Sequence, residues 1–191
     1  MIKVPKPATI LNLGPVDANA IMDRLSMLSD TAWESEDAAK ENKYRCFQNT
    51  KHIIHRFIPK NRDPLMSYDT RAWFIWKDLL MPIMDHATRQ YGYRERAYPK
   101  SMFARLAAGK VIEPHCDGAG SHLLTHKIHI PLATTPDATF QVAGETFHLP
   151  AGHAFEVNNI VEHGAFNRGQ TDRIHFIFEM YDASQLSSQA A

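Results

Sequence analysis

The apolar residues of the chain follow one period in its first half and another in its second half. In residues 18–30 and 68–92 they recur every three or four positions, which predicts two amphipathic helices. Asp17 stands where it can cap the first helix, and Pro82 should kink or split the second. Between them, residues 50–59 are rich in β-branched and apolar side chains, which predicts a strand that could lie at a sheet edge.

From about residue 101 apolar and polar residues alternate in short runs that are separated by turn residues. Such runs occupy residues 101–110, 126–133, 138–150, 153–159 and 172–182. Their period predicts strands, and Ala143-Gly144-Glu145 is typical of a hairpin turn. Helices followed by a series of strands predict an α+β protein whose β part is a sandwich or barrel. We expect Trp73 and Trp76 to pack on a sheet.

The runs at residues 126–133 and 172–182 are apolar on one face and polar on the other. The polar residues are Lys127, His129, Arg173, His175 and Glu179. We expect the apolar faces to pack on helices and the polar faces to point into a barrel. Because buried cations are costly unless an anion neutralises them, a carboxylate-bearing ligand inside the barrel would explain both strands. Arg173 could hold that carboxylate through two parallel hydrogen bonds.

The size and composition of the chain indicate a single domain. With 191 residues it can bury a substantial core. We expect residues 1–100 to form a mainly helical support, residues 101–181 to form the barrel, and residues 183–191 to be a frayed tail. The oligomeric state is not indicated by any pattern.

Charge and terminal sequence restrict the expected partners and location. The formal net charge is zero, which argues against nucleic acid or an anionic membrane and favours a small-molecule or peptide partner. The first 17 residues fit neither a signal peptide nor a membrane span, which predicts a cytoplasmic protein. Cys46 and Cys116 should then be free thiols.

Two histidines and an aspartate have a spacing that suits a metal ion. In an extended segment His115 and Asp117 share one face and can direct an imidazole nitrogen and a carboxylate to one point. His163, which is followed by a glycine, offers a third ligand. Two histidines and one carboxylate leave three positions open on an octahedral ion. That arrangement suits non-haem Fe(II) oxygenases, although the same residue types also bind zinc.

The order of these residues resembles that of a known family. The segments are "PHCD", "HKIHIPL", "LPAGHAFEVNN" and "EHGAFNRGQTDRIHF", within residues 101–181. They resemble the aspartyl/asparaginyl β-hydroxylase family of Fe(II)- and 2-oxoglutarate-dependent oxygenases, which also includes bacterial hydroxylases of free proline. The resemblance implies a double-stranded β-helix, or cupin-like jelly roll, with N-terminal helices packed on one sheet.

The same resemblance assigns roles to residues. It implies that His115, Asp117 and His163 are the iron ligands at the catalytic centre. Arg173 would hold the distal carboxylate of 2-oxoglutarate. Lys127 and His129 fall where the family has an Arg-x-His that contacts the cosubstrate, so a lysine here replaces the arginine. Asp117 is also a departure from some members, which lack the carboxylate.

The activity that follows is a dioxygenase that uses Fe(II), 2-oxoglutarate and O₂ to hydroxylate an amino acid or an Asp/Asn-type peptide side chain. One alternative is a zinc or manganese cupin that acts as a hydrolase or isomerase. Another is a cupin-like binding protein without catalysis. Arg173 discriminates between the first two, because an oxygenase needs a carboxylate clamp deep in the barrel and a hydrolase does not.

Overall fold

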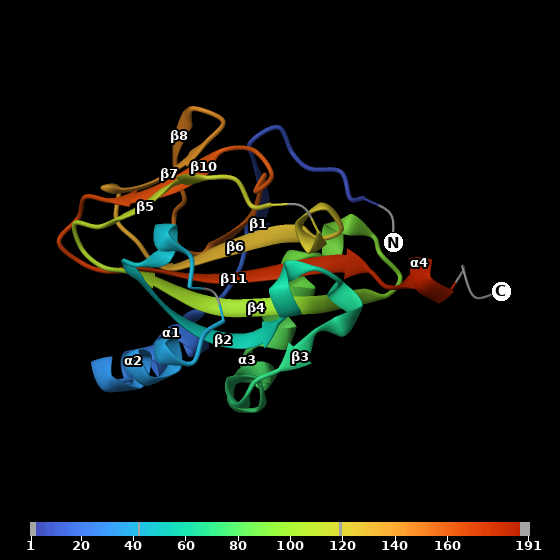
Figure 1. Ribbon diagram of the computed structural model, residues 1–191, viewed down its shortest axis with the longest axis horizontal. Coiled ribbons are helices and arrows are strands. Elements are labelled where there is room, and N and C mark those ends of the chain that lie inside the picture. Colours follow the sequence, from blue (N-terminus) through green and yellow to red (C-terminus); the bar gives the residue numbers. More distant parts are fainter. Residues whose placement is uncertain (1–2, 42, 119, 188–191) are drawn as a thin grey trace.

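A computed structural model describes residues 3–41, 43–118 and 120–187, and it contains two antiparallel sheets that face each other (Figure 1). The large sheet has the order β1 (Ile10–Pro15), β9 (His153–Val157), β6 (His126–Ala133), β11 (Arg173–Asp182), β4 (Arg96–Leu106), β2 (Thr50–Phe57) and β3 (Tyr68–Asp69). The small sheet has the order β5 (Val111–His115), β10 (His163–Asn167), β7 (Ala138–Val142) and β8 (Glu145–His148). This is the double-stranded β-helix, or cupin-like jelly roll, of an α+β protein, as predicted.

Helices cover the face of the large sheet that is turned away from the small sheet (Figure 1). They are α1 (Asn19–Ser26), α2 (Asp30–Ala38) and α3 (Arg71–Ala87), and a short α4 (Ser184–Ser187) follows the last strand. Single 3₁₀ turns occur at Arg45–Phe47, Pro59–Asn61, Pro64–Met66, Arg89–Tyr91 and Ser121–Leu123. No helix in the described ranges is long and apolar enough to cross a membrane.

The N-terminal helical segment contains two helices where one was predicted. Residues 18–30 do not form one helix, because α1 ends at Ser26 and α2 begins after Ser29, whose Oγ accepts a hydrogen bond from the Ala32 N–H. Asp17 does not occupy the cap position itself, which is Ala18, although its carboxylate accepts from the Asn19 N–H. A serine followed by an aspartate was thus a second helix start that the prediction overlooked.

The longest helix is shorter than the predicted 68–92, because Tyr68–Asp69 form β3 and Arg89–Tyr91 form a 3₁₀ turn. α3 runs as one helix through Pro82, so the proline does not split it. Trp73 and Trp76 are buried in a core that includes Ile130 and Phe176 of the large sheet. Burying each large apolar side chain stabilises the fold by about 1.5–3 kcal/mol, and this packing fixes the helix on the sheet.

A second apolar core lies between the two sheets. It joins Phe140 and Val142 of β7 to Phe155 and Val157 of β9. At the far end of β7, Ala143 and Gly144 have φ angles of 50° and 83° and connect it to β8, so the predicted hairpin is confirmed. This second core fills one part of the space between the sheets, while the rest is a cavity lined by both polar and apolar residues.

β2 lies close to a sheet edge. On one side it pairs with β4, and on the other β3 pairs only with Arg56 and Phe57. Among the described residues, the part of β2 before Arg56 has no strand partner on that side. There the His52 N–H donates to the Asp37 carboxylate of α2 (2.8 Å), and Lys40, just after α2, donates through Nζ to the Thr50 carbonyl. The helix therefore covers backbone groups that would otherwise offer a pairing edge.

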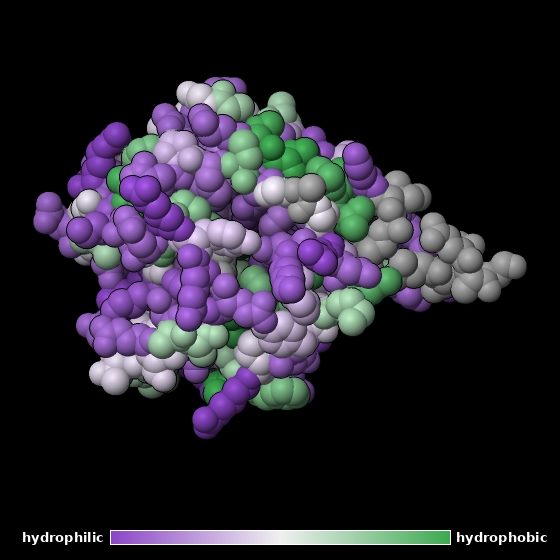
Figure 2. All heavy atoms as spheres, in the orientation of Figure 1, coloured by the Kyte–Doolittle hydropathy of each residue, from purple (hydrophilic) through white to green (hydrophobic). Residues whose placement is uncertain are grey.

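The helical and β segments are more interleaved than the expected division at residue 100. The first 100 residues contain the three long helices, but they also supply β1, β2 and β3 to the large sheet, and β4 already begins at Arg96. The expected tail at 183–191 includes α4, and residues 188–191 lie outside the described part. Cys46 and Cys116 are free thiols, as predicted. Hydrophilic residues cover most of the face seen in Figure 2.

Candidate metal centre and its cavity

The pairing of β5 with β10 brings two of the predicted ligands together. His115 lies directly opposite His163 in the register, and their ring centroids are 4.4 Å apart. Asp117 follows β5, and its N–H donates to the Asn159 carbonyl at 2.9 Å. The ligand atoms of His115, Asp117 and His163 all lie within 4.8 Å of one another. His163, which is 46 or more positions from the other two residues in sequence, therefore joins them in one cluster.

Both histidines present Nε2 to this cluster, because Nδ1 of each ring is hydrogen-bonded to the backbone. His115 Nδ1 lies 2.7 Å from the Glu113 carbonyl and His163 Nδ1 lies 2.9 Å from the Val161 carbonyl, so each Nδ1–H donates to the backbone two residues earlier. The Nε2 lone pair of each ring then remains for a ligand. Burial, together with the nearby Lys127, lowers the pKa of His163 to about 4, which keeps the imidazole neutral and able to bind a metal.

The Asp117 carboxylate is held by one oxygen. Its Oδ2 accepts from Lys127 Nζ (2.5 Å) and from Asn159 Nδ2 (2.9 Å), while Oδ1 lies 3.9 Å from His115 Nε2. Burial would raise the pKa of Asp117, but Lys127 and His122 hold it well below its usual range. The carboxylate is therefore ionised, with Oδ1 turned toward the histidines.

These observations fit a divalent metal ion. His115 Nε2 is buried and has no hydrogen-bond partner among the described residues, which is costly unless something binds it. Two imidazoles and one carboxylate within 4.8 Å are the donor set of non-haem iron sites.

The cluster lies in the wall of a cavity of about 400 Å³ between the two sheets. At one end of this cavity Arg173 is 3% exposed, and its Nη2 donates to His175 Nδ1 at 3.1 Å. The guanidinium lies over the Phe140 ring, 5.6 Å from its centroid, and no carboxylate in the described chain lies within 4 Å of it. Burial lowers the pKa of Arg173 to about 9, so the group stays charged at neutral pH.

A buried cation without a counter-ion indicates that an anion belongs beside it. His129 and His175 lie at the same end, with their Nδ1 atoms 3.4 Å apart, and the Nε2 of each is buried without a hydrogen-bond partner within the described ranges. Burial lowers the pKa of both rings, which keeps them neutral. This end therefore offers one fixed positive charge and the neutral imidazole of His129 to a ligand, while His175 contacts Arg173 and does not line the cavity.

Lys127 has a different partner from the one that the resemblance implies. Its ammonium group contacts Asp117, a metal-ligand candidate, and the cosubstrate contact stays a prediction. The apolar and polar faces of the two inner strands are as predicted: Ile128 and Phe176 pack in the helical core, and Lys127, His129 and Arg173 line the cavity.

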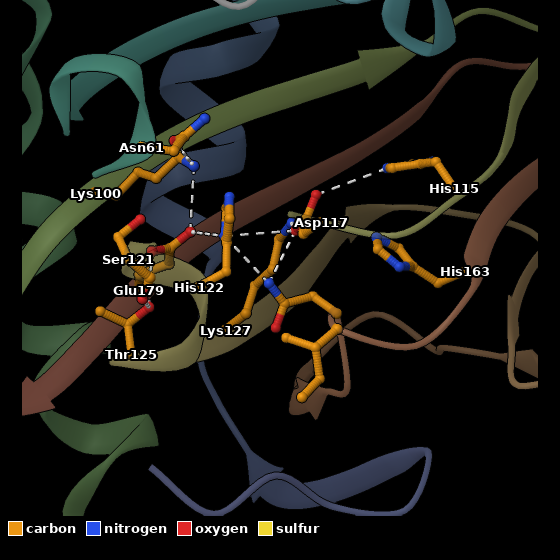
Figure 3. Close-up of polar contacts among 12 residues, drawn as sticks. Asn61, Lys100, His115, Asp117, Ser121, His122, Thr125, Lys127, His163 and Glu179 are labelled. Carbon is orange, nitrogen blue, oxygen red and sulfur yellow. Dashed lines mark hydrogen bonds and ion pairs between the residues drawn. The ribbon is translucent and has the colours of Figure 1, made fainter. Parts of the chain in front are cut away.

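A second group of charged residues lines the cavity near the other end of β11 from Arg173, and Figure 3 shows it on the side of Asp117 away from His115 and His163. Glu179 of β11 lies opposite Lys100 of β4 in the sheet register, and Lys100 Nζ is 3.2 Å from Glu179 Oε1. His122 Nδ1 lies 3.4 Å from the same oxygen, and Asn61 accepts from Lys100 Nζ at 2.8 Å. Burial would raise the pKa of Glu179, but Lys100 and His122 hold it below its ordinary value. This carboxylate is therefore ionised.

No sequence pattern indicated that these residues form a group. Glu179 was placed on the inner face of its strand, but no motif distinguished Lys100 or Asn61, which come from the expected helical half. Position along the inner face of β4 could have indicated Lys100 if the pairing of β4 with β11 had been known. No local signal indicated Asn61.

A jelly roll with two histidines and a carboxylate at an inner cavity is the architecture of cupin-like metal-binding proteins, and non-haem iron oxygenases are one class of them. The sequence model of the aspartyl/asparaginyl β-hydroxylase family matches residues 66–183, and the chain belongs to this family. The family places the protein among the hydroxylases of oxygenase type. No curated protein matches the sequence.

Solved structures with the same fold share little sequence with this chain. A viral collagen prolyl hydroxylase from Paramecium Bursaria Chlorella virus-1, in complex with 2-oxoglutarate, has a TM-score of 0.54 and 9% identity over 90% of this chain and 95% of its own. The non-heme monooxygenase ThoJ, as its nickel complex, has a TM-score of 0.56 and 12% identity over 91% and 74%.

A 2-oxoglutarate-Fe(II) oxygenase family member from Burkholderia pseudomallei has a TM-score of 0.53 and 11% identity over 70% of this chain, which spans 66% of that protein. At such identities the likeness of these three proteins establishes the fold alone.

Proposed function

We propose that the protein is an Fe(II)- and 2-oxoglutarate-dependent dioxygenase that hydroxylates an amino acid or an Asp/Asn-type side chain. One observation carries the proposal: a cluster of His115, Asp117 and His163 shares a cavity with Arg173, a buried cation that has no carboxylate partner among the described residues. The first feature suits a divalent metal, and the second suits a dicarboxylate beside it.

In this proposal His115 Nε2, His163 Nε2 and Asp117 Oδ1 hold the iron and leave three positions open. Iron and 2-oxoglutarate, when bound, would supply with O₂ the oxidising power for an unactivated C–H bond. One oxygen atom enters the alcohol, and the other enters the succinate that remains when 2-oxoglutarate loses CO₂. Arg173 holds the distal carboxylate of 2-oxoglutarate through its guanidinium fork. His129 provides a neutral ring near that group.

Part of the remaining wall of the cavity is apolar. Ile112, Phe140 and Ala165 of the small sheet are buried around it, and Met102 lies on the opposite wall. An apolar lining strengthens each electrostatic contact with a bound ligand and protects the oxidant from side reactions. In this proposal the chain orients the ligands and lines part of the site with apolar groups, and the metal supplies the chemistry.

The test is an anaerobic titration of the metal-free protein with Fe(II) and 2-oxoglutarate, followed by visible absorption. We expect a metal-to-ligand charge-transfer band in the wild type that is lost with His115→Ala and weakened with Arg173→Ala. The exposed Arg168→Ala is the matched control and should leave the band unchanged. Absence of the band at saturating iron and 2-oxoglutarate would refute the proposal and favour a zinc or manganese cupin or a binding protein.

A further inference from the structure

The charged end of the cavity opposite Arg173 has no role in holding iron or 2-oxoglutarate. It is formed by Lys100 and Glu179, which are 6% and 1% exposed and lie side by side on β4 and β11 (Figure 3). Both residues line the same cavity as the metal centre. Two opposite charges are thus presented, next to each other, to the space in which a substrate would meet the metal.

The two oxygens of the Glu179 carboxylate have different partners. Glu179 Oε2 accepts from Thr125 Oγ1 at 2.8 Å. Glu179 Oε1 is buried and makes no hydrogen bond within the described chain, although Lys100 Nζ at 3.2 Å and His122 Nδ1 at 3.4 Å face it as charge partners. A buried carboxylate oxygen without a hydrogen-bond donor is a position that a donor from a ligand would stabilise.

The third member, Asn61, is held beside Lys100 by a strained turn. Lys60 and Asn61 have φ angles of 53° and 52°, a left-handed conformation that is uncommon for residues other than glycine. Asn61 Oδ1 accepts from Lys100 Nζ, and no described residue accepts a hydrogen bond from its Nδ2. Residues in such conformations cluster at functional sites, and here the turn brings an amide to the charged pair at the cavity.

These groups complement a molecule that carries an ammonium and a carboxylate on neighbouring atoms. An ammonium group would donate to Glu179 Oε1, and a carboxylate would accept from Lys100 Nζ and Asn61 Nδ2. A residue inside a peptide has neither charge on its backbone. A cavity of about 400 Å³ is at the small end of the range for ligand sites and must also contain 2-oxoglutarate, which favours a small substrate.

We propose that Lys100, Glu179 and Asn61 form the subsite for the charged head group of a free α-amino acid, the substrate to be hydroxylated. The inference rests on the proposed function, because it places this head group at the end of the cavity away from the 2-oxoglutarate carboxylate. The side chain of the amino acid would then extend toward the metal centre.

The test measures binding in the absence of turnover. Protein loaded with Ni(II) and 2-oxoglutarate is titrated by calorimetry with the twenty standard L-amino acids, and each ligand that binds is compared with its N-acetyl and C-amide derivatives. We expect at least one free amino acid to bind, and each derivative to bind at least tenfold more weakly. Because this comparison uses the wild-type protein, it does not depend on the folding of any variant.

Variants test the residues themselves. Lys100→Met and Glu179→Gln should each weaken amino-acid binding at least tenfold while 2-oxoglutarate binding stays within twofold of the wild type. Lys110→Met, at an exposed lysine, should change neither. If a single substitution unfolds the protein, the pair Lys100→Gln with Glu179→Gln removes both charges together and should give the same loss.

Two results would overturn the inference. One is that none of the twenty amino acids binds although 2-oxoglutarate does, which would leave the proposed dioxygenase standing. The other is equal binding of the free and blocked forms. Failure of 2-oxoglutarate itself to bind would instead refute both proposals, so the two failures are distinguishable.

Discussion

At the scale of single residues, Lys127 and Asp117 are two departures from the family pattern that form an ion pair. The chain has a lysine where the family pattern has an arginine, and it has a carboxylate that some members lack. In the structure these two departures are in contact, because Lys127 Nζ and Asn159 Nδ2 both donate to Asp117 Oδ2. Groups that fix one oxygen of a ligating carboxylate orient the other, and such partners strongly affect metal affinity.

We therefore expect Lys127→Met to weaken the binding of Mn(II) by about 10–100-fold in the absence of 2-oxoglutarate. Lys127→Arg, which keeps a cation beside Asp117, should bind the metal nearly as the wild type does. Metal titration followed by electron paramagnetic resonance measures the affinity. Tighter binding by Lys127→Met would contradict this expectation, because it would mean that charge repulsion between Lys127 and the metal outweighs the orientation of Asp117.

His55 is a second residue whose environment has a measurable consequence. It is fully buried among Trp76, Phe103 and Phe176, and neither ring nitrogen has a hydrogen-bond partner in the described ranges. Burial lowers its pKa to about 3, whereas the unfolded chain should titrate near 6.5. The unfolded state then binds one more proton between these values, so the stability is complete above pH 6.5 and falls as the pH approaches 3.

We expect His55→Leu to reduce the pH dependence of the free energy of unfolding between pH 6 and 4 by about 1.4 kcal/mol per pH unit. Urea unfolding at several pH values measures this slope. His86→Leu, at an exposed histidine, shows whether burial is responsible. Equal slopes for His55→Leu and the wild type would mean that the native protein takes up a proton at His55.

At the scale of elements, the cavity depends on contacts between loops and strands that are distant in sequence. The loop after Asp117 packs against the turn at Pro59–Asn61, and Gly120 is the point of contact. Gly120 has a φ of +91°, and a Cβ built there would lie 2.5 Å from the Asn61 carbonyl oxygen. Both the conformation and the close approach therefore require glycine at this position.

Gly120→Ala should lower the free energy of unfolding by about 1–3 kcal/mol, because it combines a strained conformation with a backbone clash. Gly118→Ala is the matched control: its φ is not in the left-handed region and a Cβ there would meet nothing within 4 Å, so a change below about 0.5 kcal/mol is expected. Chemical denaturation measures both variants. A neutral Gly120→Ala would indicate that the loop and the turn can separate without cost.

At the scale of the whole molecule, a metal ion would join the loop after β5 to β10. His115 and His163 come from neighbouring strands of the small sheet, and Asp117 is tied to Lys127 of the large sheet. The unfolded chain does not bring these groups together, so a bound ion stabilises the folded state selectively.

Addition of Ni(II) at about 100 times its dissociation constant should stabilise the protein by about 2.7 kcal/mol. The measurement is the midpoint of thermal unfolding with and without metal. His163→Ala should abolish the increase, whereas His148→Ala, outside the cavity, should preserve it. An equal increase in the two variants would place the metal elsewhere.

Local sequence determined those features that depend on neighbouring residues. The period of two sufficed to place Lys127 and His129 on the inner face of one strand, and the His115-x-Asp117 spacing put two donors on one side, because alternation along a strand is a local property. The resemblance to the family supplied the remaining order. The division of residues 18–30 into two helices was also encoded locally, at Ser29, and was overlooked.

Only the tertiary structure decided which of these residues meet. The partner of Lys127 is Asp117, the partner of Glu179 is Lys100, and His163 faces His115, each through a strand register or a loop position. A contact between residues far apart in sequence is set by how the sheets pair and pack, and a shift of one position would turn a side chain to the other face. For that reason the inner face of each strand could be predicted from the sequence, whereas the second charged end of the cavity could not.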